Sequence, residues 1–165
     1  MAFTLSSPAF VAGGDIPQQF TCEGDDIPPH LVWSGAHKDV ASFALIVDDP
    51  DAPNGAFTHW VVFDIPADRT DLPSGTRSDA IGVSGRNSSG QIGYMGPCPP
   101  SGTHRYFFRL FALDVKSLGL TVGASRQQVE QAIAAHTIAT AELMGRYGYR
   151  TGGRLEASEV AGARK

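Results

Sequence analysis

SFALIV, at residues 42–47, is the strongest indication of the fold in this chain. It is continuous, apolar and rich in β-formers, and it is too short for a helix, so it predicts a strand buried on both faces within a sandwich. Two further runs also predict strands: THWVVFD at residues 58–64, which is too short and too rich in β-formers for a helix, and HRYFFRLFALD at residues 104–114. Between the first two lies DDPDAPNG, residues 48–55, whose prolines and Asn-Gly pair predict a rigid turn-rich loop.

Length and composition fit a single mainly β domain. The chain has 165 residues, of which 42% are hydrophobic, and its 19 glycines and 11 prolines favour short strands joined by many turns. We expect one domain over residues 1–150 and a flexible tail over residues 151–165. Three short strands are also expected, near residues 19–22, 31–33 and 81–83, within otherwise turn-rich sequence.

Only one stretch has the pattern of a helix. Ser125 with Gln128 forms a capping-box motif, and Val129 and Ile133 begin a stripe with helical spacing that extends to Leu143. This pattern predicts a helix that stops near Gly145, followed by a final strand over residues 146–150.

The charge balance excludes some partners. The net charge is −4 and Lys and Arg do not cluster, so we expect no nucleic-acid partner. No apolar run approaches the length of a membrane-spanning helix, so we expect no integral membrane association. The first residues lack the pattern of a secretory signal, which makes the cytoplasm the expected location. Cys22 and Cys98 are far apart in sequence and should be free thiols in that compartment, acting as small buried fillers.

Polar, titratable side chains lie at one end of each long strand. Asp49 continues the alternation of Phe43 and its apolar partners, and His59 shares parity with Val61. His104 and Tyr106 are two residues apart and should project side by side. If these strand ends converge, they form a small pocket with apolar walls and a polar mouth. In the first two strands the opposite face is apolar as well, so parity leaves the pocket side open.

Such a pocket suits an anion. Two imidazoles and a phenol can donate hydrogen bonds to phosphate or carboxylate oxygens. Asp49 would repel an anion if it were unpaired, so we expect it to orient and charge His59 and raise the pKa of that imidazole. Anion binding should then weaken as pH rises through the histidine pKa.

The same residues allow other interpretations. The aspartates of residues 48–51 are also ordinary turn residues, His59 also suits a core position, and residues 104–106 also suit an amphipathic strand. Asp49, Asp51, His59 and His104 could form a two-His-one-carboxylate metal site, but no supporting spacing is present. No GxSxG elbow occurs, and activation of Cys98 would need a neighbouring imidazolium or helix start. We therefore expect no catalytic residues, no metal and no cofactor.

Four segments resemble the phosphatidylethanolamine-binding protein family. They are FTCEGDDIPPHLVW (residues 20–33), DDPDAP (48–53), THWVVFDIPA (58–67) and GYMGPCPPSGTHRYFFRLFALD (93–114). The resemblance covers residues 3–150 and is greatest to the bacterial branch often labelled Raf-kinase-inhibitor-like. It implies a sandwich of two antiparallel sheets with one C-terminal α-helix, and it is compatible with a homodimer.

The resemblance also implies a pocket for phosphate, phosphorylated head groups, acetate or similar ions. The residues that match the pocket motifs of the family are Asp49, Asp51, Pro53, His59, Gly96, Pro99, Pro100, His104 and Tyr106.

The favoured interpretation is a binding module, not an enzyme, for a small anionic or phosphorylated ligand. A second interpretation is a protein-interaction role, in which the Pro/Gly-rich loop of residues 93–103 inhibits a serine protease or a kinase. A third is a weak hydrolase that uses His59 and Asp49 as a general-base pair. Family roles differ on one fold, so the fold alone does not choose between them.

Overall fold

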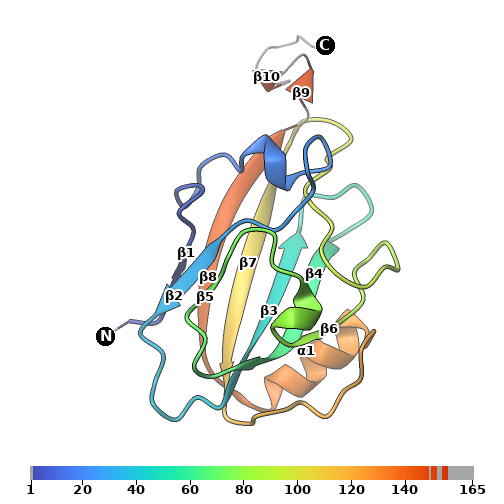
Figure 1. The fold of residues 1–165 in the computed structure, drawn as a ribbon. Coiled ribbons are helices and arrows are strands. Elements are labelled where there is room, and N and C mark those ends of the chain that lie inside the picture. The colour runs from blue at the N-terminus through green and yellow to red at the C-terminus, as the bar shows by residue number, and fades with distance from the viewer. Residues whose placement is uncertain (1, 149, 152–153, 156–165) are drawn as a thin grey trace.

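Two antiparallel sheets form the body of the computed structural model, which describes residues 2–148, 150–151 and 154–155. The smaller sheet has the order β1-β2-β5 and the larger has the order β6-β4-β3-β7-β8. The strands of the smaller sheet are β1 (Thr4–Ser6), β2 (Leu31–Ser34) and β5 (Asp71–Leu72). The strands of the larger sheet are β3 (Ser42–Asp49), β4 (Phe57–Pro66), β6 (Val83–Ser84), β7 (Thr103–Leu113) and β8 (Thr137–Gly148). The predicted sandwich is confirmed (Figure 1).

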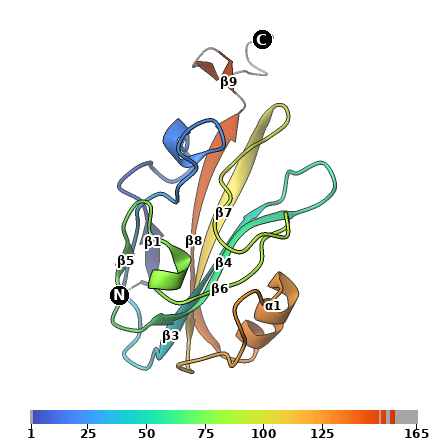
Figure 2. The ribbon, with the colours of Figure 1, turned by 45° about the vertical axis from the view of Figure 1, so that its right-hand side comes forward.

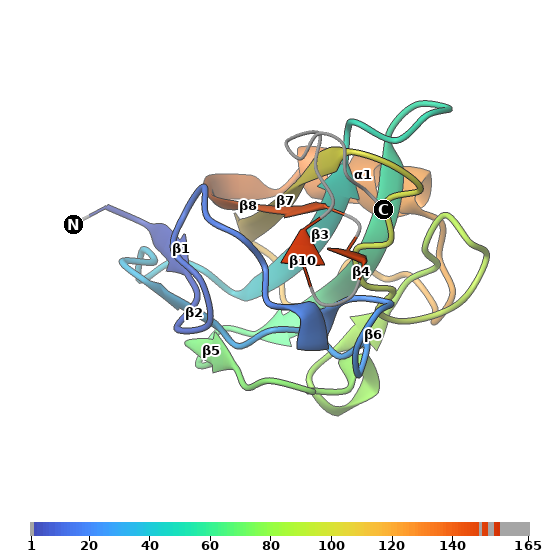
Figure 3. The same ribbon diagram turned by 90° about the horizontal axis from the view of Figure 1, so that it is seen from above.

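The main core lies between the two sheets, as the view from above shows (Figure 3). Leu31 and Trp33 of β2 face it from the smaller sheet, and Phe43, Leu45 and Val47 of β3 face it from the larger. Every residue of β3 is buried, so the strand predicted from SFALIV is covered on both faces.

The second face of the larger sheet is covered by helix α1 (Arg126–Ala134) (Figure 2). Val129 and Ile133 of the helix pack on Ile46 and Val61 of the sheet. The predicted capping box is present, because Ser125 accepts from the Gln128 backbone N–H while the Gln128 side chain accepts from the Ser125 N–H. This helix buries the second face of β3, which is why every residue of that strand is buried.

The predicted extent of the helix is wrong. It ends at Ala134, and residues 137–148 form β8, which pairs along the whole length of β7. Ala141, Leu143 and Tyr147 alternate with exposed or half-buried residues, so strand periodicity overrides the helical spacing that the sequence also permits. Part of the separate final strand predicted over residues 146–150 belongs to β8, which ends at Gly148. The short strands β9 (Arg150–Thr151) and β10 (Arg154–Leu155) pair with each other.

Two shorter elements also differ from expectation. The strand predicted near residues 19–22 is instead a 3₁₀ turn, η1 (Gln18–Phe20), and a second 3₁₀ turn, η2 (Ser78–Ala80), precedes β6. The strand expected near residues 81–83 lies at Val83–Ser84. Most of the predicted flexible tail lies outside the described residues. Among the residues described, no helix has the length and apolar character needed to cross a membrane.

The expectation of two free, buried thiols is wrong. Cys22 and Cys98 form a disulfide, and both residues are exposed. The bond joins the segment after η1 to the loop that precedes β7, two regions that are distant in sequence and adjacent in the fold. The expectation of free thiols followed from an assumed reducing compartment and not from any geometry in the sequence.

Candidate functional site

A β-bulge in β4 turns His59 toward the interior of the sandwich. Val47 pairs with Trp60, but the next residue, Asp48, pairs with Thr58, so His59 has no direct partner across the strands. Without the bulge, alternation would place His59 on the helix-covered face with Val61. Instead, its ring lies 5.3 Å from that of Tyr106, on the opposite face.

Asp49 and His104 form a buried pair where β3 ends and β7 begins, at the upper end of the sheet in Figure 1. Asp49 Oδ2 lies 2.6 Å from His104 Nδ1, and the residues are only 3% and 7% exposed. The carboxylate fixes Nδ1 as the donating nitrogen, because an ionised carboxylate can only accept. His104 Nε2 is therefore the ring nitrogen left for a ligand.

His59 is held by the backbone of Met95. The Nδ1–H of the ring donates to the Met95 carbonyl at 2.7 Å, and the Met95 N–H donates to the His59 carbonyl at 2.9 Å. Burial lowers the pKa of the imidazole below its usual value, and the Met95 carbonyl and the charge of Asp49 offset this only in part. The expectation that Asp49 would bind His59 and raise its pKa is thus wrong, because Asp49 is paired with His104.

Tyr106 lies between the two imidazoles. Its ring is 6.4 Å from that of His104 as well as close to that of His59, and the residue is 1% exposed. Within the described part of the chain the O–H of this buried phenol finds no acceptor, and the Cys98 backbone N–H approaches the Oη atom only as a donor that offsets part of the pKa rise. Burial and the nearby charge of Asp49 raise the pKa of the phenol, so it stays a neutral donor.

These groups border a cavity of about 190 Å³, which we call the cup. Its lining residues are Asp49, Ala52, Pro53, Phe57, His59, Met95, Cys98, Pro99, Pro100 and His104. The walls are mainly apolar, and two imidazoles and one carboxylate supply the polarity. Of the site residues expected from sequence, six line the cup and a seventh, Tyr106, packs against both of its histidines.

Asp51 does not line the cup. Its carboxylate accepts from Arg105 Nε and Nη2, each at 2.9 Å, and from the Arg105 backbone N–H. These hydrogen bonds lower the pKa of Asp51 to about 2. Asp51 therefore fastens the 50–56 turn to β7 and supports the cup from outside.

Gly96 also has a supporting position. Its N–H donates to Asp26 Oδ1 at 2.8 Å, and a Cβ at this position would lie 2.4 Å from both Asp26 Oδ1 and the Phe20 carbonyl oxygen. Only glycine allows the loop to approach the N-terminal segment this closely.

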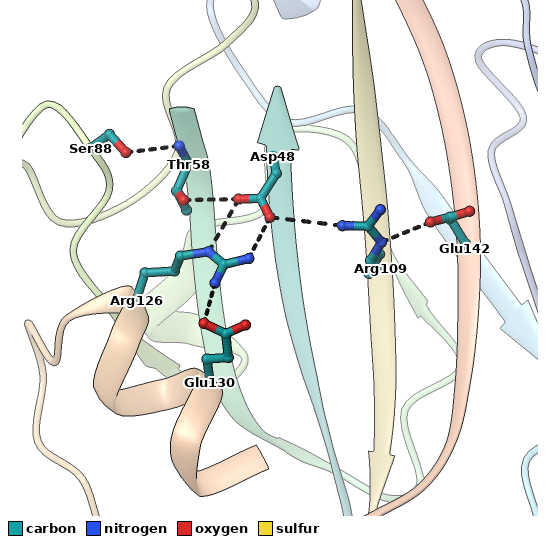
Figure 4. Close-up of polar contacts among 7 residues, drawn as sticks. All are labelled: Asp48, Thr58, Ser88, Arg109, Arg126, Glu130 and Glu142. Carbon is teal, nitrogen blue, oxygen red and sulfur yellow. Dashed lines mark hydrogen bonds and ion pairs between the residues drawn. The ribbon is translucent and has the colours of Figure 1, made fainter. Parts of the chain in front are cut away.

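A charged cluster supports the cup from the reverse face of the sheet (Figure 4). The buried Asp48 carboxylate accepts from Thr58 Oγ1 at 2.8 Å and from Arg126 Nη2 at 2.6 Å, and Arg109 Nη1 lies 3.9 Å away. Ser88 continues the cluster, because its hydroxyl accepts from the Thr58 N–H. The cluster thus fixes Thr58, the residue that precedes His59 in the bulge.

Asp48 was predicted only as a turn residue, and its place in this cluster was not predicted. Arg126 also pairs with Glu130, and Arg109 pairs with Glu142. A usable signal was the parity of Asp48, which places it with Ala44 and Ile46 on the face opposite Asp49. Its partner Arg126 follows the helix cap Ser125 and could not be placed from sequence.

Comparisons with known proteins agree on one family. The family model described as phosphatidylethanolamine-binding protein matches residues 6–148. The UPF0098 protein of Methanothermobacter thermautotrophicus is 49% identical over 147 residues, which cover 87% of this chain and 97% of the relative. The UPF0098 protein of Aquifex aeolicus is 48% identical and covers 86% of this chain and 85% of its own length.

Two solved structures share the fold. A phosphatidylethanolamine-binding protein homologue from Chlamydia trachomatis superposes with a TM-score of 0.86 at 40% identity, covering 90% of this chain and 99% of its own. YbcL from E. coli, described as a member of the mammalian family of such proteins, gives a TM-score of 0.84 at 33% identity, covering 91% of this chain and all of its own.

Proposed function

This chain belongs to the phosphatidylethanolamine-binding protein family, and from that premise we propose that the cup binds a small anionic group such as phosphate or a phosphorylated head group. The observation that carries the proposal is the Tyr106 hydroxyl, which is buried beside two histidines and whose O–H finds no acceptor among the described residues. Buried donors are nearly always satisfied, so an unpaired O–H beside the two cup histidines argues for an acceptor supplied by a ligand.

The histidines support the same ligand class. His59 and His104 each use Nδ1 within the protein, toward Met95 and Asp49 respectively. When either ring is protonated, its Nε2–H becomes a donor for an oxygen of the ligand. Two such donors and a phenol suit the several acceptor oxygens of a phosphate group.

The size of the cup limits the ligand. At about 190 Å³ the cavity is smaller than the 300–1,000 Å³ typical of sites for drug-sized molecules. The cup therefore suits a single phosphate with a short substituent, and the acyl chains of a lipid would have to lie outside it.

We propose binding without turnover. The cup holds its imidazoles by fixed hydrogen bonds, and Cys98, the cysteine on its wall, is bonded to Cys22 and offers no thiolate. Incubation of O-phosphorylethanolamine with the pure protein should release no phosphate. Phosphate release that survives purification and disappears in His59→Ala would support the hydrolase alternative instead.

NMR of the histidine side chains tests the binding proposal. O-phosphorylethanolamine should shift the signals of His59 and His104 in a saturable manner, while those of His37, an exposed histidine that does not line the cup, should stay in place. His59→Ala should weaken binding at least tenfold, because it removes one of the donors. Unchanged affinity in this variant would refute the assignment of the cup.

One observation favours a second candidate, inhibition of a protease or kinase. Pro100, Ser101 and Gly102 are exposed in a loop that the disulfide fastens at Cys98. An exposed loop with restricted conformations loses little entropy when a partner binds it. An assay of serine proteases and kinases with the protein tests this role. Inhibition by the wild type that Ser101→Trp abolishes would support it, and activity unaffected by the protein would contradict it.

The disulfide also bears on the location of the protein. We propose the cytoplasm, where disulfides are usually transient, catalytic or redox-sensing, and therefore also propose that the bond is partly reduced there. Acid quenching of intact cells followed by alkylation of thiols tests both points. A fully oxidised pool would contradict the cytoplasmic location.

A further inference from the structure

The disulfide holds the wall of the cup. Cys98 lines the cavity beside Pro99 and Pro100, and its partner Cys22 lies in the segment that follows η1. Both cysteines are exposed, so an external thiol can reach the bond.

Hydrogen bonds fasten only the first part of this loop to the N-terminal segment. Tyr94 Oη donates to the Phe20 carbonyl at 2.7 Å, and the Cys22 N–H donates to the Pro97 carbonyl at 3.1 Å. In the described structure, residues 99–102 make no hydrogen bond to any other segment before β7 begins at Thr103. Cys98 is therefore the last tether before the prolines that line the cup.

We propose that the Cys22–Cys98 bond is a redox control of the cup: the oxidised protein holds the anion, and reduction by a dithiol releases residues 98–102 and weakens binding. The inference rests on the proposed function, since it regulates the same cavity. Because Asp49, His59, His104 and Tyr106 are positioned by β3, β4 and β7, reduction leaves these four side chains in place and alters the wall that encloses the ligand.

The reaction is thiol–disulfide exchange. One thiolate of the dithiol attacks a sulfur of the exposed bond, forming a mixed disulfide and releasing the other cysteine as a thiolate, which takes up a proton. The second thiol of the reagent then displaces the first cysteine. The two cysteines end as thiols, the dithiol ends as a disulfide, and two electrons have passed to the protein.

By thermodynamic linkage, the coupling between anion binding and the disulfide can also be measured as an effect of the anion on the redox potential of the bond. If the closed wall binds the anion about tenfold more tightly than the released wall, the anion stabilises the oxidised form by the same factor. For a two-electron couple a tenfold factor equals about 30 mV. Saturating phosphate should therefore make the midpoint potential of the bond about 30 mV more negative.

The experiment compares inorganic phosphate binding to oxidised, dithiothreitol-reduced and reoxidised protein, with ¹⁵N spectra recorded for each. We expect about tenfold weaker binding after reduction, full recovery on reoxidation, and line broadening or shifts concentrated in residues 98–102. Cys22→Ser/Cys98→Ser should bind like the reduced protein and should not respond to dithiothreitol.

The outcomes separate the two claims. Equal affinity of the oxidised and reduced proteins would overturn the redox control and leave the anion site standing. Absence of phosphate binding by the oxidised protein would refute the proposed function and the control with it. Loss of the dispersed spectrum on reduction would also overturn the proposal, because the bond would then hold the entire fold and not the cup wall alone.

Discussion

Asp48 and Asp49 are adjacent in the chain, yet their carboxylates lie on opposite faces of the larger sheet. Asp49 points into the sandwich and pairs with His104, whereas Asp48 points toward α1 and pairs with Arg126. Because successive side chains of a strand point to opposite faces, β3 places the Asp49 carboxylate at the cup and the Asp48 carboxylate in the charged cluster behind it. Because Asp48 also holds Thr58, the two faces together set the position of His59.

Replacement of Asp48 should destabilise the protein and disturb the cup. Asp48→Asn removes the charge from a buried carboxylate and leaves Arg126, which is one-third exposed, without its main partner. We expect a loss of about 2 kcal/mol in the free energy of unfolding, less than for a fully buried pair because water can reach the arginine. Urea denaturation measures this loss, and the His59 NMR signals should shift as the bulge relaxes.

A matched control lies in the same cluster. Glu142→Gln breaks only the exposed pair with Arg109 and should cost less than about 1 kcal/mol. Equal losses in the two variants would mean that Asp48 has no special role in supporting the bulge.

Two aspartates of one motif should behave differently in anion binding. Asp49→Asn removes the charge that fixes the His104 ring, and we expect about tenfold weaker phosphate binding, since charge-assisted hydrogen bonds are roughly twice as strong as neutral ones. Asp51→Asn touches only Arg105 and should leave the affinity within about twofold. Isothermal titration calorimetry measures the phosphate affinity of both variants. Tighter binding in Asp49→Asn would show that repulsion of the anion outweighs ring orientation.

Sulfate binding should strengthen as pH falls. The pKa of His59 is lowered by burial, so near neutral pH its Nε2 is an acceptor, and only protonation turns it into a donor toward an anion. Sulfate keeps its charge across this range, so the pH dependence reports on the protein alone. Affinity should rise as pH falls below about 6.5 toward the lowered pKa. Affinity that rises with pH would contradict the assigned role of His59.

Without a ligand, the same histidine should make the protein less stable in mild acid. Between the lowered pKa of folded His59 and the unfolded value of about 6.5, the unfolded chain binds more protons, so stability increases with pH. The free energy of unfolding should therefore drop as the pH falls through about 6.5 toward the lowered pKa of folded His59. His59→Gln should show a smaller drop, and an identical drop in both proteins would assign the effect to other groups.

The sequence predicts the strands well where burial determines them. Residues 42–47 form a mainly apolar run because α1 covers one face of β3 and the smaller sheet covers the other. The run is too short for a helix, so a buried strand is the element that it predicts. Residues 137–148 are ambiguous, since Thr140 and Leu143 fit both a helical and an alternating pattern. Pairing with β7 resolves the ambiguity, and that contact is not local.

Six of the residues named from the sequence line the cup, but the contacts between them were not predicted. Strand pairing places Asp49 and Tyr106 on one face, whereas His59 reaches that face only through a bulge that no local sequence motif predicts. The partner of Asp49 and the bond between Cys22 and Cys98 also depend on contacts between distant segments. Such contacts depend on the three-dimensional arrangement of the chain and have no signal in the local sequence.

The most direct test of the anion site is a crystal structure of the oxidised protein grown with phosphate at saturating concentration. The account predicts one phosphate in the cup, with its oxygens within hydrogen-bonding distance of His59 Nε2, His104 Nε2 and Tyr106 Oη. A cup that stays free of phosphate while phosphate occupies other surfaces of the molecule would contradict it.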